Sequence, residues 1–108
     1  MIDGQAPIVI YVTFDDLSLA KKVARAVVKQ RLGACVNVMP GVFSTYEWEG
    51  TVEEGEEVLM LIKTLKNKEA ALIQLITDLH SYDEPAIMSF PVVGGADSFL
   101  EWARGQVS

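Results

Sequence analysis

The chain of 108 residues is half hydrophobic and has a formal net charge of −6, a composition that excludes an intrinsically disordered protein and disfavours binding to nucleic acid or an anionic membrane. No apolar run is long enough to cross a bilayer, the first residues lack the pattern of a secretory signal, and the single cysteine, Cys35, cannot form an intrachain disulfide. We therefore expect one cytoplasmic domain over residues 1–108.

The first two elements are predicted to be a buried strand and an amphipathic helix. Residues 8–14 form a continuous apolar and β-branched run, which is typical of a strand covered on both faces. Asp15 or Asp16 provides an N-cap for the helix, whose apolar residues recur at i, i+3, i+4 and i+7 until Gly33 ends it. The solvent-facing side of this helix carries four basic residues: Lys21, Lys22, Arg25 and Lys29.

Residues 34–65 are predicted to form one long β-hairpin that turns near Glu49-Gly50. At about 3.3 Å per residue each arm would extend about 45–50 Å, far beyond the usual strand of about 5–6 residues. We expect bulges or bends at Pro40-Gly41 and at Gly55. The acidic run over residues 53–57 is interpreted as a solvated stretch that protects the edge, with Glu57 as the exception. An unprotected edge of this length promotes aggregation, so we infer that copies of the chain pair with one another.

A second helix, a fourth strand and a short last helix complete the chain. Asn67 is the predicted N-cap of the second helix, and Pro85 prevents that helix from continuing. Residues 86–93 are the predicted fourth strand. Ser98 and Glu101 have the capping-box spacing at the start of the last helix. The inner stripe of that helix is predicted to consist of three residues: Phe99, Leu100 and Ala103.

The order β-α-β-β-α-β followed by a short helix predicts an α+β, ferredoxin-like (split βαβ) sandwich. Right-handed crossovers place both main helices on one face of a four-stranded antiparallel sheet. The other face would then expose more apolar surface than a monomer tolerates. We therefore expect oligomerisation through sheet faces and hairpin edges, and a closed ring would leave no edge free.

Polar residues inside the predicted strands indicate a second kind of feature. Asn37 and Lys63 interrupt apolar strands, and burial would oblige them to find partners such as Glu57, Tyr46 and Thr64. Such a cluster at a subunit boundary is either a small-ligand pocket or a device that fixes the strand register. Two further aromatic residues with a polar atom, common at interfaces, are assigned to the same pocket: Trp48 and Tyr82.

Metal ligands are scarce, because the chain has one histidine, one cysteine and four methionines. His80 is a candidate metal ligand, with Asp83 and Glu84 nearby or with the same residues of a symmetry mate; alternatively, it closes the second helix by hydrogen bonding to its last carbonyls. Cys35 is either a ligand or a small buried hydrophobe near the start of a strand. No Ser-His-Asp order, phosphate loop or Cys-x-x-Cys motif is present in the sequence, so we do not expect an enzyme.

Five separated motifs that span nearly the whole chain resemble those of the CutA divalent-cation tolerance family. They are Gly33-Ala-Cys-Val-Asn37, Ser44-x-Tyr46-x-Trp48-x-Gly50, Glu57 with Lys63-Thr64, Leu79-His80-x-Tyr82-x-x-Pro85, and Phe99-Leu-x-Trp102. The resemblance implies a ferredoxin-like protomer in a tight homotrimer, in which the long hairpins pair with neighbouring subunits. It also implies a role in tolerance to heavy metals such as copper, and an overall likeness to the trimeric PII signalling proteins.

The resemblance also suggests where a metal would bind. The copper site described in the family uses a cysteine in the first strand and two adjacent histidines after the second helix, at positions that correspond here to Val12, Leu79 and His80. Only His80 is retained, so the implied cofactor is a divalent cation such as copper, bound weakly or absent in the purified protein.

Two functional hypotheses follow from the motifs and the predicted assembly. The first is a divalent-cation tolerance protein that binds metal ions or acts by an indirect regulatory route. The alternative is a PII-like trimeric signalling protein that binds a small ligand in the clefts between subunits. An RNA-binding module of the same fold is disfavoured, because Tyr11 is not accompanied by a basic run and the net charge is negative.

Overall fold

The computed structural model describes residues 3–107 and has the predicted order of elements with one added 3₁₀ turn. The four strands form one antiparallel sheet in the order β2-β3-β1-β4, so the predicted α+β class and sheet are confirmed. None of the helices in residues 3–107 is long and apolar enough to span a bilayer. The elements are β1 (Pro7–Phe14), α1 (Leu17–Lys29), β2 (Cys35–Trp48), β3 (Thr51–Leu65), η1 (Lys66–Lys68), α2 (Glu69–Leu79), β4 (Ile87–Pro91) and α3 (Asp97–Val107).

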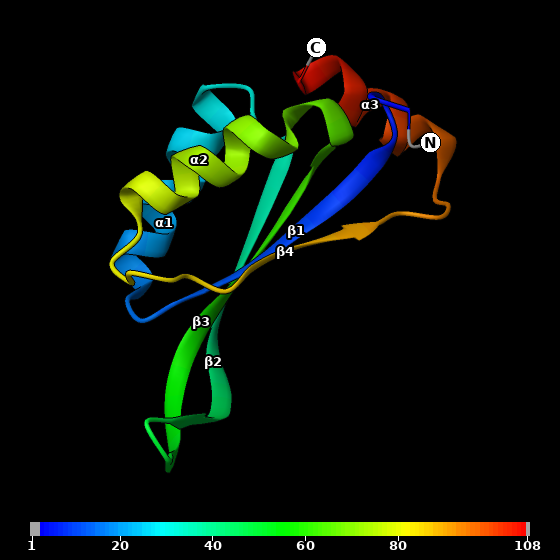
Figure 1. Cartoon of the computed structure of the whole chain (residues 1–108). Helices are drawn as coiled ribbons and strands as arrows, with labels where there is room; N and C mark the ends of the chain where they lie inside the picture. Colours follow the sequence, from blue (N-terminus) through cyan, green and yellow to red (C-terminus); the bar gives the residue numbers. More distant parts are fainter. Residues whose placement is uncertain (1–2, 108) are drawn as a thin grey trace.

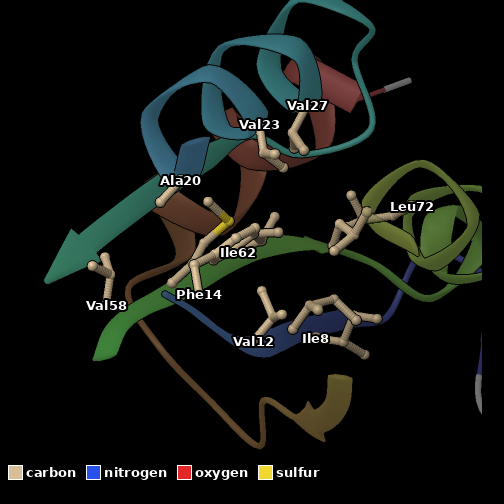
Figure 2. Packing of buried hydrophobic residues seen from close by; sticks show 12 residues of the cluster. Ile8, Val12, Phe14, Ala20, Val23, Val27, Val58, Ile62 and Leu72 are labelled. Atoms are coloured by element: carbon tan, nitrogen blue, oxygen red, sulfur yellow. The ribbon is translucent and has the colours of Figure 1, made fainter. Parts of the chain in front are cut away.

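The core lies between one face of the sheet and the helices α1 and α2, which cover that face (Figure 1). Alternate residues of β1 and β3 point toward the helices, and Phe14 and Ile62 are fully buried. Figure 2 shows Val23 and Val27 of α1 and Leu72 of α2 reaching into the same layer. Burying a side chain of this size stabilises the fold by about 1.5–3 kcal/mol, so this layer positions the rest of the molecule.

The start of α1 follows the prediction, whereas its end does not. Asp16 is the N-cap, and its Oδ2 accepts a hydrogen bond of 3.0 Å from the backbone N–H of Leu19. The helix ends at Lys29, and the left-handed residue that follows is Arg31, with φ 57°, not the predicted Gly33. Gly33 is required for a different reason: a Cβ atom there would lie 2.6 Å from Val27 Cγ1, inside the core.

The predicted N-cap of α2 is wrong. Asn67 lies inside the 3₁₀ turn η1, and α2 begins at Glu69 without a side-chain cap. The backbone N–H of Asn67 donates instead to the carbonyl of Gly4, 2.8 Å away, and the N–H of Lys66 donates to Ala6 O at 2.9 Å. Backbone pairing with the segment before β1 therefore fixes this region, and no local capping signal is needed.

The capping box predicted for the last helix is also wrong. α3 begins at Asp97, so Ser98 lies in its first turn and cannot be the N-cap. The predicted inner stripe is only partly right: Ala103 is buried and is joined by Val107, but Phe99 is 40% exposed. α3 packs by these two residues against Ala34 and Leu65 at one end of the sheet.

The long hairpin is confirmed, with strands of 14 and 15 residues that stay paired up to Trp48 and Thr51. It extends well beyond the other strands and the helices, toward the bottom of Figure 1. Glu49 and Gly50 form the turn with φ values of 51° and 81°, the left-handed pair that a two-residue type I′ turn requires. The register shifts between Met39 and Val42, as predicted at Pro40-Gly41. The predicted irregularity at Gly55 is wrong, because Gly55 pairs regularly with Ser44.

The sheet face opposite α1 and α2 is apolar, as predicted from the strand patterns. β4 is shorter than predicted and still places Met88 beside Tyr11 and Phe90 beside Val9. Met88 and Phe90 are 50% and 46% exposed. We call this surface the open face of the sheet; its cross-strand rows are Asn37, Leu61, Tyr11 and Met88, followed by Cys35, Lys63, Val9 and Phe90.

Candidate functional site

An open groove of about 810 Å³ lies between the outer half of the hairpin and the segment 81–86 that follows α2. It brings together two predicted metal ligands, Asp83 and Glu84, and three predicted pocket residues, Tyr46, Trp48 and Tyr82. The groove, which we call the acidic groove, is lined by Tyr46, Trp48, Glu53, Ser81, Tyr82, Asp83, Glu84 and Ala86. Three of these residues carry carboxylates and none is basic, so the groove attracts cations.

Sequence reasoning missed three lining residues: Glu53, Ser81 and Ala86. Glu53 was assigned to the solvated acidic stretch, although the sequence contains a signal for its position. A two-residue turn at Glu49-Gly50 pairs Trp48 with Thr51 and therefore Tyr46 with Glu53, which is the observed register. No comparable local signal points to Ser81 or Ala86, because the packing of their segment decides their place.

His80 stands at the start of the segment that forms one wall of the acidic groove. Its ring stacks on Phe14 with the centroids 4.3 Å apart and an interplanar angle of 13°. Its Nε2 lies 2.8 Å from the carbonyl oxygen of Thr13, and the backbone N–H of Tyr82 donates to its Nδ1 over 3.0 Å. A carbonyl can only accept and a backbone N–H can only donate, so the ring is the neutral tautomer with its proton on Nε2.

Both ring nitrogens of His80 are therefore engaged, and a metal ion would have to displace one of these two hydrogen bonds. The role of His80 as a metal ligand stays a prediction. The alternative role, hydrogen bonding to the last carbonyls of α2, is wrong, because the carbonyl that His80 contacts belongs to Thr13 in β1. What the geometry shows is a side chain that joins the end of α2 to the first strand.

Two further hydrogen bonds hold the same wall of the groove. The Tyr82 hydroxyl donates to Glu57 Oε2 at 2.8 Å, which ties the segment to β3. Ser81 Oγ donates to Asp15 Oδ1 at 2.8 Å, which ties it to the turn between β1 and α1. Loss of solvent and, next, the hydrogen bond to the Glu57 carboxylate raise the pKa of Tyr82. The wall is thus fixed by three consecutive residues, each bonded to a different part of the fold.

Lys63 and Thr64, assigned to the pocket from sequence, lie at the other end of the sheet. The Thr64 hydroxyl points to the helix side and donates to Leu32 O at 2.7 Å. The Lys63 ammonium lies 5.5 Å from the centre of the Phe99 ring. Both residues line a smaller, mainly apolar cavity of about 200 Å³ beneath α3, separate from the acidic groove.

Cys35 and Asn37 lie on the open face of the sheet. Cys35 is half-buried and stands opposite Lys63, whereas Asn37 is exposed and stands opposite Leu61. Neither residue lines the acidic groove. Within residues 3–107, no three His, Cys, Asp or Glu side chains are close enough together to hold a metal ion. Apart from His80 and Glu57, which hydrogen-bond to Tyr82 in the groove wall, the predicted site residues therefore divide into an acidic groove, a cavity beneath α3 and the open face.

Comparison with known proteins identifies the family. Residues 8–106 match the model of the family described as CutA1 divalent ion tolerance protein. The chain is 41% identical over 97 residues to the chloroplastic protein CutA of Arabidopsis thaliana, covering 90% of this chain and 53% of that protein. It is 38% identical over 96 residues to the divalent-cation tolerance protein CutA of Thermus thermophilus, covering 89% and 93%.

The fold is shared as well. The crystal structure of CutA from Xylella fastidiosa superimposes with a TM-score of 0.93 and 34% identity, covering 95% of this chain and 99% of that one. The chain spans about half the length of the curated plant and mammalian relatives that it matches. The family match over residues 8–106, these identities and the common fold together show that the chain belongs to the CutA1 family of divalent ion tolerance proteins.

Proposed function

We propose that this chain serves divalent-cation tolerance as a cytoplasmic homotrimer that binds divalent cations such as copper weakly at the acidic groove. The observation that carries the proposal is the convergence of Glu53, Asp83 and Glu84 on one groove that has no basic lining residue. Carboxylate oxygens are good ligands for hard divalent cations, whereas copper also favours imidazole. No nucleic-acid or membrane partner is expected.

Weak binding follows from the geometry of a single protomer. The carboxylates line a wide groove and do not form a compact set of ligands, so one chain would leave most coordination positions to water. A neighbouring subunit in a trimer could add ligands to the same groove. If the groove does not bind cations, the indirect regulatory route is the remaining form of the same function.

The proposed trimer is supported by the apolar surface that one protomer leaves uncovered. Met88 and Phe90 are half exposed on the open face, and on the hairpin Phe43, Trp48 and Val52 are 82%, 60% and 66% exposed. Large exposed apolar patches are rare on soluble monomers. A ring of three copies would cover the open faces and pair the long edges of the hairpins.

Light scattering coupled to size-exclusion chromatography tests the trimer. We expect a mass of three times 11.9 kDa at micromolar protomer concentration, stable to dilution. A mass near that of one chain would reject the trimer and leave the open face without an explanation.

Calorimetric titration of apo protein with Mn²⁺ and with Cu²⁺ tests the cation site. The variant Glu53→Gln/Asp83→Asn/Glu84→Gln should bind Mn²⁺ several-fold more weakly than wild type. A variant with exposed carboxylates of α3 neutralised, Asp97→Asn/Glu101→Gln, is the control and should bind as wild type does. Equal weakening in both variants would mean that only the overall charge matters, and the groove would not be a cation site.

Copper requires a separate titration with its own variant, because His80 is the only histidine in the chain. If copper binds through His80, the variant His80→Ala should lose most of its copper affinity, a larger loss than the one that loosening of the groove wall causes in the Mn²⁺ titration. Equal copper binding by wild type and His80→Ala would remove this residue from the site.

A second candidate function is binding of a small organic ligand, as in the PII-like alternative. The observation that favours it is the size and chemistry of the acidic groove: about 810 Å³, with three aromatic residues beside the carboxylates. Clefts for small molecules commonly measure about 300–1,000 Å³ and are lined by aromatic side chains. Fluorescence of Trp48 in a Trp102→Phe variant, titrated with a panel of neutral and cationic aromatic compounds, tests it, because the groove carboxylates would repel the phosphates of a nucleotide. An unchanged spectrum throughout would count against this candidate.

A further inference from the structure

The outer face of α1 carries a concentration of positive charge that the proposed function does not use. Residues 17–46 contain no Asp or Glu and hold five of the nine basic residues of the chain, whereas the remaining residues hold four basic and all 15 acidic ones. The four basic residues of α1 are all exposed: Lys21, Lys22, Arg25 and Lys29. An acidic protein therefore has one strongly basic helix.

These cations are not neutralised within the chain. Among residues 3–107 the only ion pair joins Lys66 to Glu69, so no carboxylate lies within 4.0 Å of a basic group on α1. Lys21, Arg25 and Lys29 stand four residues apart on one side of the helix, and like charges at this spacing destabilise an isolated helix. Lys29, in the last turn, is placed to stabilise α1 through the helix dipole, but Lys21 and Arg25 do not serve the stability of the helix in this way. All of these side chains are exposed to solvent.

Hydrophobic side chains lie directly beside the basic residues of α1. A shallow groove of about 410 Å³ between α1 and the outer strand β2 is lined by Ala24, Arg25, Val28, Lys29 and Val36. Val28 is 46% exposed, which is unusual for a valine on a helix that is otherwise well packed. A second hollow of about 250 Å³ shares Val28 and Lys29 and adds Arg31. We call the two together the basic groove, defined by Ala24, Arg25, Val28, Lys29, Arg31 and Val36.

We propose that the basic groove is a docking surface for an acidic segment of a partner polypeptide. Charge complementarity selects the acidic groups, which would pair with Arg25, Lys29 and Arg31. The apolar floor at Val28 and Val36 would accept a hydrophobic side chain of the same segment, which an inorganic anion could not use. Val36 pairs with the buried Ile62 and so lies on the helix side of the sheet, not on the open face.

The charge on the rest of the molecule favours a polypeptide over nucleic acid or a membrane. Fields between exposed charges decay over about 10 Å at 0.1 M ionic strength, so a short peptide in the groove senses mainly α1. A duplex or a vesicle surface presents phosphates over a much larger area and would also meet the many carboxylates elsewhere in the chain. A short acidic segment therefore matches both the extent and the chemistry of the groove.

Fluorescence anisotropy with a labelled synthetic peptide, a run of glutamates flanking one leucine, tests the proposal on the full chain. We expect salt-sensitive binding by wild type, and about tenfold weaker binding by Arg25→Gln/Lys29→Gln. The matched control Lys66→Gln/Lys68→Gln removes the same number of charges and should stay within about twofold of wild type. Val28→Ser leaves the charge unchanged and should weaken binding several-fold. Circular dichroism and thermal unfolding establish that each variant is folded.

Four outcomes would overturn the proposal. They are no binding by wild type at about 50 mM salt, equal weakening in the two double variants, equal binding of a glutamine version of the peptide, and no effect of Val28→Ser. Vesicles containing phosphatidylserine and duplex RNA are titrated in parallel. If either binds more tightly than the peptide and depends on Arg25 and Lys29, the partner class is wrong.

Discussion

Gly33 offers the sharpest test of the packing between α1 and the sheet. The substitution Gly33→Ala would place a methyl group 2.6 Å from Val27 Cγ1 and 2.7 Å from Ile62 Cγ2. Carbon atoms in cores approach no closer than about 3.5–4.0 Å without repulsion. Val27 and Ile62 are both fully buried, so neither can turn aside into solvent. The added methyl group must therefore displace the turn after α1 or the neighbouring strand.

The expected loss of stability combines two opposing effects. Inserting a methyl group into a packed core costs about 1–3 kcal/mol, while replacing glycine restricts the unfolded chain and returns about 0.4–1 kcal/mol. The net expectation for Gly33→Ala is a loss of about 1–2 kcal/mol in the free energy of unfolding. With a urea m-value of about 1–3 kcal/mol/M, the midpoint should fall by about 0.5–1 M.

Urea unfolding followed by circular dichroism, at one fixed protomer concentration, measures this loss. Gly55→Ala is the matched control, because a Cβ at Gly55 meets nothing within 4 Å in the middle of β3. That variant should be about 0.5–1 kcal/mol more stable than wild type. The same chemical change should thus have opposite signs at the two positions. A Gly33→Ala midpoint at or above that of wild type would refute the packing of this turn.

Three further predictions each concern one side-chain hydrogen bond, and urea unfolding measures all three. Tyr82→Phe removes the hydrogen bond to Glu57 and should cost about 1 kcal/mol at neutral pH. The pKa of Tyr82 is higher in the folded state than in the unfolded state. The stability that this hydroxyl contributes is therefore complete below about pH 10, the unfolded pKa, and decreases as the pH rises above that value. Tyr82→Phe lacks the hydroxyl and should lose less stability than wild type at alkaline pH. His80→Phe preserves a stacked ring but leaves the buried carbonyl of Thr13 without its donor, at a cost of about 1–3 kcal/mol. Asp16→Ala removes the N-cap of α1 and should cost about 0.5–2 kcal/mol.

Each of these three has an outcome that would contradict it. A parallel alkaline loss in wild type and Tyr82→Phe would show that another group controls stability there. Unchanged stability of His80→Phe would mean that the bond to β1 contributes nothing. Equal stabilities of Asp16→Ala and wild type would show that water replaces the cap without loss.

The elements could be predicted where local patterns decide them. The apolar run of β1, the cap at Asp16 and the turn at Glu49-Gly50 are local signals, and each correctly located its element. The failures occur where distant backbone decides. Asn67 is held by the carbonyl of Gly4, a contact across more than half of the chain that no capping rule can anticipate.

The pocket residues illustrate how a single bulge changes a site prediction. An uninterrupted hairpin with its turn at Glu49-Gly50 would pair Asn37 with Ile62 and direct it into the core. The register shift between Met39 and Val42 pairs Asn37 with Leu61 instead, on the open face. The position of the bulge is a local signal, whereas its effect on the side that Asn37 faces appears only when the register is counted through it. The bulge thus moves Asn37 from the core to the open face, and Asn37 lies apart from the acidic groove because it is nine residues away from Tyr46 along β2.

The arrangement of His80, Ser81 and Tyr82 bears directly on the choice between the proposed functions. Because three consecutive residues bond to β1, to the following turn and to β3, this wall of the acidic groove is formed before any ligand arrives. A preformed wall lowers the ordering cost of binding, so weak affinity would reflect the ligand set and not flexibility. Copper at His80 would break the bond to Thr13 or to the Tyr82 N–H and would loosen that wall. Cation binding by the groove carboxylates and copper binding by His80 therefore oppose each other, and Mn²⁺ should weaken copper binding if both occur.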